Sequence, residues 1–268
     1  MPSLKIATWN INSVRLRAEL VARFIKTYHP DLLCLQEIKC TEDQFPIDTL
    51  RAAGLPHIAI HGQKAYHGVA TLSRFPFLST DRLDFCKKGD ARHLDTVIDV
   101  LGTPITLSNF YIPAGGDIPD PAQNEKFAHK LQFVDEFTAW STMCAGHDNR
   151  IAVGDFNIAP LEHDVWSHKQ LLKVVSHTPV ETDGLKAALA AGNWIDLMRE
   201  HIPEPEKLYT WWSYRAKDWS ASDRGRRLDH VWVDRKLGSN SVSVEALREV
   251  RGWDGPSDHA PVIATFEL

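Results

Sequence analysis

The chain has 268 residues, a formal net charge of −5 at pH 7, and 43% hydrophobic and 24% charged residues, which is typical of an ordinary globular protein. No apolar run is long enough for a transmembrane helix, and the N-terminus MPSLKIATWN lacks the layout of a signal peptide. The negative net charge excludes recruitment of nucleic acid by bulk attraction, although a local basic surface can still steer DNA.

Hydrophobic spacing in the first half of the chain predicts strands and helices in turn. The alternating pattern of HLDTVIDV and a turn at residues 102–103 favour a hairpin. The expected elements are a strand at 5–9, a helix at 14–28, a strand at 31–36, a short helix at 41–54, paired strands at 57–62 and 68–73, and the hairpin 93–100 with 104–113.

The second half has a similar order. We expect a long amphipathic helix at 124–143, a strand at 151–157, helices near 185–192 and 194–202, and strands at 209–215, 227–234 and 259–268. Two such halves indicate packed sheets covered by helices, and we expect a single domain over residues 1–268.

The stretch RIAVGDFNIAP places two polar residues at the end of an apolar strand. Alternation along a strand puts Asp155 and Asn157 on the same face. Buried polar groups are rarely left without partners, so these two side chains point to a site.

Other polar residues share this position at or near strand ends, where sheet proteins commonly place their sites. They are Asn10, Asn12, Glu37, Asn109, Tyr111, Asp229, Asp258 and His259. Each alone has an ordinary structural explanation as a turn former, helix cap or core residue. Together, their carboxylate and amide oxygens suit Mg²⁺ or Mn²⁺ rather than zinc.

Such a set favours phosphoester hydrolysis, in which a metal neutralises charge, a carboxylate activates water and an aspartate orients a histidine. The sequence has no GxxxxGK[ST] loop, which argues against an NTPase, and no GxSxG turn, which argues against a serine hydrolase.

Six motifs, TWNINSVR, LCLQEIK, NFYIPAGG, GDFNIAP, RRLDHVWV and SDHAP, resemble in this order the exonuclease III family of abasic-site endonucleases, of the endonuclease/exonuclease/phosphatase superfamily. The match runs from about residue 4 to the C-terminus, and YTWWSYR favours the exonuclease III branch. The resemblance implies an α/β fold, namely a four-layer α/β sandwich with two central mixed β-sheets flanked by helices. It also implies Mg²⁺-dependent cleavage 5′ to abasic sites in duplex DNA, together with 3′→5′ exonuclease and 3′-end phosphatase or phosphodiesterase activity.

By resemblance, Glu37 is the main metal ligand. Asn12 stands where some relatives have an aspartate, and Asp258 matches a second metal position. Mg²⁺ is the expected cofactor, for which Mn²⁺ can substitute. Asn10 is expected to position the phosphate or a metal-bound water.

The resemblance also assigns catalytic roles. Asp155 orients or deprotonates the attacking water, and Asn157 fixes the phosphate and Asp155. Asp229 bonds His259, which contacts the scissile phosphate, while Tyr111 binds that phosphate.

Expected DNA contacts complete the site. Beside Asn10, phosphate-binding roles are expected for Arg92, Asn109, Arg215, Arg226 and Arg227, and the lesion pocket is expected to contain Trp211, Leu228 and Trp253. Two positions differ from the family pattern. Arg226 stands where some relatives have a bulky apolar residue, and Ala114 stands where many have Asn or Gln.

Three other functions stay open. A superfamily phosphoesterase acting on 3′ ends or on a non-DNA phosphoester would share the catalytic residues but lack YTWWSYR. A nuclease like deoxyribonuclease I usually carries a signal peptide and disulfides, whereas the four cysteines here form no CxxC pair and favour a reduced, cytoplasmic setting. A catalytically silent DNA-binding protein would not need magnesium. A monomer acting on duplex DNA with abasic sites or blocked 3′ ends, away from membranes, is the expectation.

Overall fold

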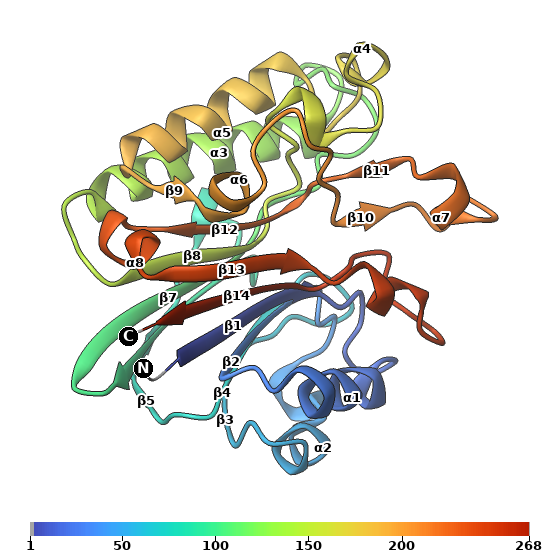
Figure 1. Cartoon of the computed structure of the whole chain (residues 1–268). Coiled ribbons are helices and arrows are strands. Elements are labelled where there is room, and N and C mark those ends of the chain that lie inside the picture. The colour runs from blue at the N-terminus through green and yellow to red at the C-terminus, as the bar shows by residue number, and fades with distance from the viewer. Residues whose placement is uncertain (1–2, 268) are drawn as a thin grey trace.

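Two β-sheets stacked face to face form the centre of the protein, and helices cover the outer face of each sheet (Figure 1). The computed structural model describes residues 3–267. Helices α1 (Ala18–Tyr28) and α2 (Ile47–Ala52) cover one sheet, and α3 (Glu125–Cys144) and α5 (Pro179–Ala191) cover the other. The predicted four-layer α/β sandwich is therefore confirmed.

The first sheet has six strands in the order β13-β14-β1-β2-β4-β3. Their bounds are β1 (Ser3–Asn10), β2 (Leu32–Gln36), β3 (His57–His61), β4 (Val69–Ser73), β13 (Ser241–Ala246) and β14 (Val262–Glu267). Strands β1 and β2 are parallel, and the other neighbours are antiparallel. This sheet is therefore mixed, as expected.

The second sheet also has six strands, in the order β5-β6-β7-β8-β12-β9. They are β5 (Phe77–Asp81), β6 (His93–Val100), β7 (Thr103–Tyr111), β8 (Arg150–Asp155), β9 (Ile195–Asp196) and β12 (Asp229–Val233). Its parallel pair is β7 with β8, and β12 runs antiparallel to β8. A two-stranded ribbon, β10 (Trp211–Trp212) with β11 (Gly225–Arg226), lies apart from both sheets.

Short helical turns complete the fold. They are α4 (His168–Leu171), α6 (Leu197–His201), α7 (Trp219–Ser222), α8 (Arg235–Ser239), η1 (Glu42–Gln44), η2 (Phe85–Lys87), η3 (Glu162–Asp164) and η4 (Arg248–Gly252). Within residues 3–267, no helix is both long enough and apolar enough to cross a membrane.

A single apolar layer lies between the two sheets. It contains Ile6 and Leu32 of the first sheet and Leu107, Val153 and Val231 of the second, all of them buried. Each sheet packs its outer face against its own helices, but both sheets share this inner layer, which joins them into one unit. The single domain over residues 1–268 stays a prediction, which this shared core supports.

Some predicted boundaries were wrong. The helix expected at 14–28 begins at Ala18, because the backbone N–H groups of Ser13 and Val14 donate to the carbonyls of Glu37 and Ile38 and hold this segment beside the loop after β2. The strand expected at 209–215 is reduced to β10. Strands β5 and β13, which largely face solvent, were missed because their apolar alternation is weak.

Gly154 allows β7 and β8 to approach closely at the end of the second sheet. Its φ is +140°, and a Cβ atom at this position would collide with the carbonyl oxygen of Phe110. The absence of a side chain at this position therefore fixes the placement of the next residue, Asp155.

We expect Gly154→Ala to lower the free energy of unfolding by about 3 kcal/mol, because the backbone of β7 must move to admit the methyl group. Chemical denaturation monitored by circular dichroism measures this loss. Gly252→Ala is the matched control, since a Cβ atom there meets nothing within 4 Å. Equal stability of the two variants would contradict the close approach.

Candidate active site

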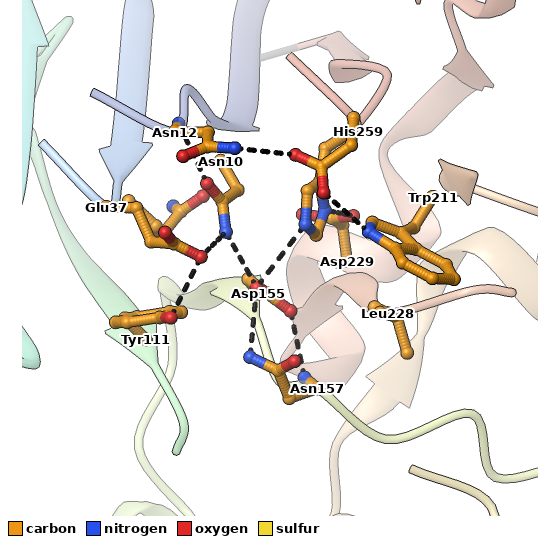
Figure 2. A network of polar contacts seen from close by, with 12 residues as sticks. Asn10, Asn12, Glu37, Tyr111, Asp155, Asn157, Trp211, Leu228, Asp229 and His259 are labelled. Atoms are coloured by element: carbon orange, nitrogen blue, oxygen red, sulfur yellow. Dashed lines mark hydrogen bonds and ion pairs between the residues drawn. The ribbon is translucent and has the colours of Figure 1, made fainter. Parts of the chain in front are cut away.

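Polar side chains from both sheets meet at one edge of the sandwich (Figure 2). Asn10 ends β1 and Glu37 follows β2, while Tyr111 ends β7 and Asp155 ends β8. Because each pair of strands is parallel, its two carboxyl ends lie together, and the hydrogen bond from Asn10 to Asp155 joins the two pairs at one edge. Asp229 begins the antiparallel strand β12 and is therefore opposite Asp155 in the register.

Asp155 is fully buried and accepts hydrogen bonds from two amides. Its Oδ2 accepts from Asn10 Nδ2 at 2.8 Å and from Asn157 Nδ2 at 3.0 Å, and its Oδ1 accepts from the Asn157 backbone N–H at 2.9 Å. Burial is the main reason that the pKa of Asp155 rises to about 7. A carboxylate with such a pKa can accept a proton near neutral pH.

Asn157 reaches Asp155 by a turn and not by strand alternation. Strand β8 ends at Asp155, two residues before the predicted end at 157. Asn157 has a φ of +54°, in the left-handed region, and this bends the chain so that its side chain faces back toward Asp155. The expectation that the two residues share a strand face was therefore wrong, although their contact is present.

His259 is held between two carboxylates. Its Nδ1 lies 2.8 Å from Asp229 Oδ2, and its Nε2 lies 3.8 Å from Asp155 Oδ2. Burial alone would lower the pKa of His259, but the charges of Asp229 and Asp155 outweigh burial and raise it to about 10. The imidazole therefore carries a positive charge at neutral pH and faces the same space as Asp155.

Glu37 organises the other side of the site. Its Oε1 accepts from Asn10 Nδ2 at 2.9 Å and from the Tyr111 hydroxyl at 2.8 Å, and its Oε2 lies 2.7 Å from Lys39 Nζ. Burial would raise the pKa of Glu37, but Lys39 and the Asn10 amide overcome it and lower the pKa. Burial and the nearby Glu37 and Asp155 carboxylates hold the pKa of Tyr111 well above its usual value, so its hydroxyl stays a donor.

The residues expected to hold a metal form a connected row. Asn12 Nδ2 donates to Asp258 Oδ1 at 3.1 Å, and Lys39 Nζ donates to Asn12 Oδ1 at 2.6 Å. The Lys39 ammonium thus lies between oxygens of Glu37 and Asn12, which shows that these oxygens face a cation. Oxygen donors of this kind fit a divalent ion such as magnesium. The sequence reasoning missed Lys39, although it stands two residues after Glu37 in LQEIK.

A second group, Asp155, Asp229 and His259, also places potential ligand atoms within 4.8 Å of one another. Hydrogen bonds within the protein already occupy several of these atoms: His259 Nδ1 lies 2.8 Å from Asp229 Oδ2, and Asp155 Oδ2 accepts from two amides. Glu37, Asn12 and Asp258 are only partly buried, so their oxygens are more accessible to an ion than those of this second group.

Trp211 and Leu228 lie together beside Asp229 and His259 (Figure 2) and belong to one small apolar cluster. Trp211 Nε1 donates to Asp258 Oδ2 at 3.0 Å. The Arg226 guanidinium lies 5.3 Å from the Trp211 ring centroid, and Trp211, Arg226 and the exposed Arg215 line a cavity of about 480 Å³. Arg226 is therefore a wall of this cavity and not a bulky apolar lid.

Arg92 lies next to Tyr111 and lines a different cavity from Arg226. It donates from Nε to Asp90 Oδ2 at 3.0 Å and from Nη1 to the Tyr111 carbonyl at 3.2 Å. Together with Tyr111 and Ala114 it lines a second cavity, of about 600 Å³.

Three expected DNA contacts were wrong. Arg227 is fully buried, and its guanidinium pairs with Asp164 and Asp196. Asn109 is buried between the sheets, where its amide bonds the carbonyls of Leu35 and Ala70 and the side chain of Gln36.

Trp253 was also misplaced. It stacks on Tyr28 of α1, 6.3 Å between ring centroids, and belongs to the core under α1, away from the cluster of Trp211 and Leu228. All three residues belong to segments that reach the site. Their side chains, however, point away from the substrate side, and sequence spacing does not reveal this direction.

Comparisons with known proteins agree with this geometry. Residues 7–259 match the Endonuclease/Exonuclease/phosphatase family. The chain is 31% identical to exodeoxyribonuclease III of Haemophilus influenzae, over 98% of this chain and 100% of that protein. An AP endonuclease from Archaeoglobus fulgidus superposes with a TM-score of 0.90 at 31% identity, covering 99% of this chain and 100% of that one. A 3′ phosphatase from Neisseria, bound to a product DNA hairpin, gives a TM-score of 0.89 at 29% identity, with coverage of 99% and 100%. The chain belongs to the exonuclease III branch of the endonuclease/exonuclease/phosphatase family.

Proposed function

We propose that the protein is a Mg²⁺-dependent DNA repair nuclease that hydrolyses the phosphodiester 5′ to an abasic site in duplex DNA. We infer in addition 3′→5′ exonuclease activity and 3′-end phosphatase or phosphodiesterase activity. The observation that carries this proposal is the buried Asp155 carboxylate, held between the Asn10 amide and the Asp229–His259 pair. The named relatives, an exodeoxyribonuclease, an AP endonuclease and a 3′ phosphatase, support the same chemistry.

Asp155 orients and deprotonates the attacking water. Its raised pKa of about 7 makes it a matched base near neutral pH, and its hydrogen bonds to Asn10 and Asn157 hold the carboxylate in one orientation. The proton of the water passes to the Asp155 carboxylate as the new P–O bond forms and the bond to the leaving 3′ oxygen breaks.

His259 stabilises the negative charge that develops on the phosphate. Asp229 keeps the imidazole charged and oriented, and Nε2 points toward the space beside Asp155. The Tyr111 hydroxyl is a second candidate donor, on the Glu37 side of the site, and would turn from Glu37 to the phosphate. The Asn157 amide donates to Asp155 and to the Ile112 carbonyl, so it acts by holding the base in place before the substrate binds.

Glu37, Asn12 and Asp258 would hold the divalent ion, with Lys39 moving aside. An ion held by these residues would supply positive charge to neutralise the phosphate, and Mn²⁺ would serve as well as Mg²⁺ because it accepts the same oxygen ligands. Asn10 links this position to the base, since its Nδ2 donates to both Glu37 and Asp155.

Duplex DNA with an abasic site or a blocked 3′ end is the proposed substrate. Trp211 and Leu228 would receive the exposed deoxyribose, and Arg92, Arg215 and Arg226 would contact phosphates around it. We propose that the protein acts as a monomer in the cytoplasm, where its four buried thiols stay reduced.

Processing of 3′ ends is the second candidate for the main activity. Arg226, with its long polar side chain beside Trp211, leaves an open cavity where a closed apolar pocket would select the abasic sugar. Ala114 is too short to enter a duplex. These features favour a larger share of 3′-end processing than a closed pocket would give.

We expect Asp155→Asn to lower the rate of incision at a tetrahydrofuran abasic analogue by about 10²- to 10⁴-fold, because the amide cannot accept the proton of the water. Single-turnover assays measure the rate, and circular dichroism confirms folding. Asp183→Asn, an exposed carboxylate on α5, is the control and should keep full activity. A folded Asp155→Asn protein with wild-type activity would refute the assigned role.

Metal dependence offers an independent test. EDTA should abolish incision of the duplex carrying the abasic analogue, and added Mg²⁺ should restore it. Glu37→Gln should raise the Mg²⁺ concentration for half-maximal rate by at least about tenfold, because a neutral ligand holds the ion more weakly. Glu125→Gln, an exposed change on α3, should leave the titration unchanged. Incision that persists in EDTA would rule out the metal role.

Ala114→Gln tests the balance of activities. A longer side chain in the cavity beside Arg92 and Tyr111 should raise abasic incision relative to exonuclease digestion of an undamaged duplex. Both rates are measured on end-labelled duplexes, with Ala122→Gln, at an exposed position, as the control. An unchanged ratio would count against a role for this position.

A further inference from the structure

A charge pair lies buried behind the catalytic residues. Lys130 of α3 and Glu181 of α5 are both fully buried, and Lys130 Nζ lies 2.5 Å from Glu181 Oε1. Burial lowers the pKa of Lys130, while Glu181 favours its charged form. Replacing such a pair by apolar residues is often neutral or stabilising, so the fold alone gives little reason for it.

Lys130 connects this pair to the base. Its ammonium donates to the carbonyl oxygens of Asn157 at 2.8 Å and Ala114 at 3.3 Å, so that with Glu181 all three of its protons have partners. Asn157 in turn donates through its backbone and its side chain to Asp155. Lys130 therefore fixes the left-handed turn that orients Asp155, although it touches neither Asp155 nor the space for substrate.

Glu181 connects the pair to the lesion cavity. Its carboxylate accepts from the backbone N–H of Ser176 at 2.9 Å and from the Thr178 hydroxyl at 2.6 Å, as part of the capping box of α5. Ser176 Oγ then accepts from Arg226 Nη1 at 2.7 Å. Because Arg226 packs over Trp211, the wall of the cavity and the catalytic turn share one buried anchor.

We propose, on the basis of the function proposed above, that Lys130 is a positioning residue. Its two carbonyl contacts hold the Asn157 turn, and therefore Asp155, in the geometry for attack, while Glu181 keeps Lys130 charged and ties it to the 176–178 loop. An apolar pair would fill the same space but leave both carbonyls without their donor. A loss of positioning should therefore appear as a lower kcat in a variant that still folds.

The test compares Glu181→Gln with the double variant Lys130→Met/Glu181→Gln. Gln at position 181 keeps the capping box, and the double change removes both charges, so no lone charge stays buried. We expect the double variant to fold and to lose at least about tenfold in kcat for the abasic duplex, with KM changed less than about threefold. Glu181→Gln alone, which keeps the Lys130 donors, should retain more of the kcat. Lys186→Met, an exposed change on α5, is the control.

A folded double variant with wild-type kcat would overturn the proposal, as would a Glu181→Gln variant as slow as the double one. If Lys130→Met/Glu181→Gln does not fold, Lys130→Gln/Glu181→Gln replaces it, since the two amides can bond each other while the shorter Gln does not span the distance to Asn157. The same loss in kcat is expected, and its absence has the same consequence. A wild-type protein that cleaves no DNA substrate would instead refute the proposed function itself.

Discussion

The hydrogen bond from Asn10 Nδ2 to Asp155 Oδ2 joins the two sheets at the edge where the chemistry is located. Asn10 ends a strand of the first sheet, and Asp155 ends a strand of the second. The same Nδ2 also donates to Glu37, so one amide sets the position of Asp155, the proposed base, relative to Glu37, the proposed metal ligand. The geometry of the site thus depends on how the sheets stack, and a shift between them would separate the two halves of the reaction.

Charge balance within this edge follows from burial. Glu37, Asp155 and Asp229 bring three carboxylates close together, and such a cluster needs compensation. His259 compensates on one side and Lys39 on the other, and each cation lowers the pKa of the carboxylate beside it. At Asp155 burial outweighs His259 and the pKa rises, whereas at Glu37 burial is outweighed and the pKa falls. One carboxylate is therefore suited to act as a base, and the other to hold a cation.

The buried Lys130–Glu181 pair supports the site from behind. Catalytic turns in the left-handed region, as at Asn157, are held only if the surrounding structure supplies enough contacts. The Lys130 ammonium donates to the carbonyl of Asn157, which lies beyond the end of β8 and is therefore outside the strand pairing of the sheet. Lys130 stands on the inward face of α3 near Phe127 and Val134, so a helical pattern marks it as buried but does not reveal what it contacts.

The sequence by itself determined the family and the sandwich fold, and it picked out the polar residues from Asn10 to His259 that meet at one edge, because motif order and apolar periodicity are local properties of the chain. Only the tertiary structure decided the direction of each side chain. Arg227, adjacent to Arg226 in the sequence, turns into a buried network with Asp164, while Arg226 lines the cavity. Alternation predicts that neighbours diverge, but which of them faces solvent depends on packing between segments that are distant in the chain.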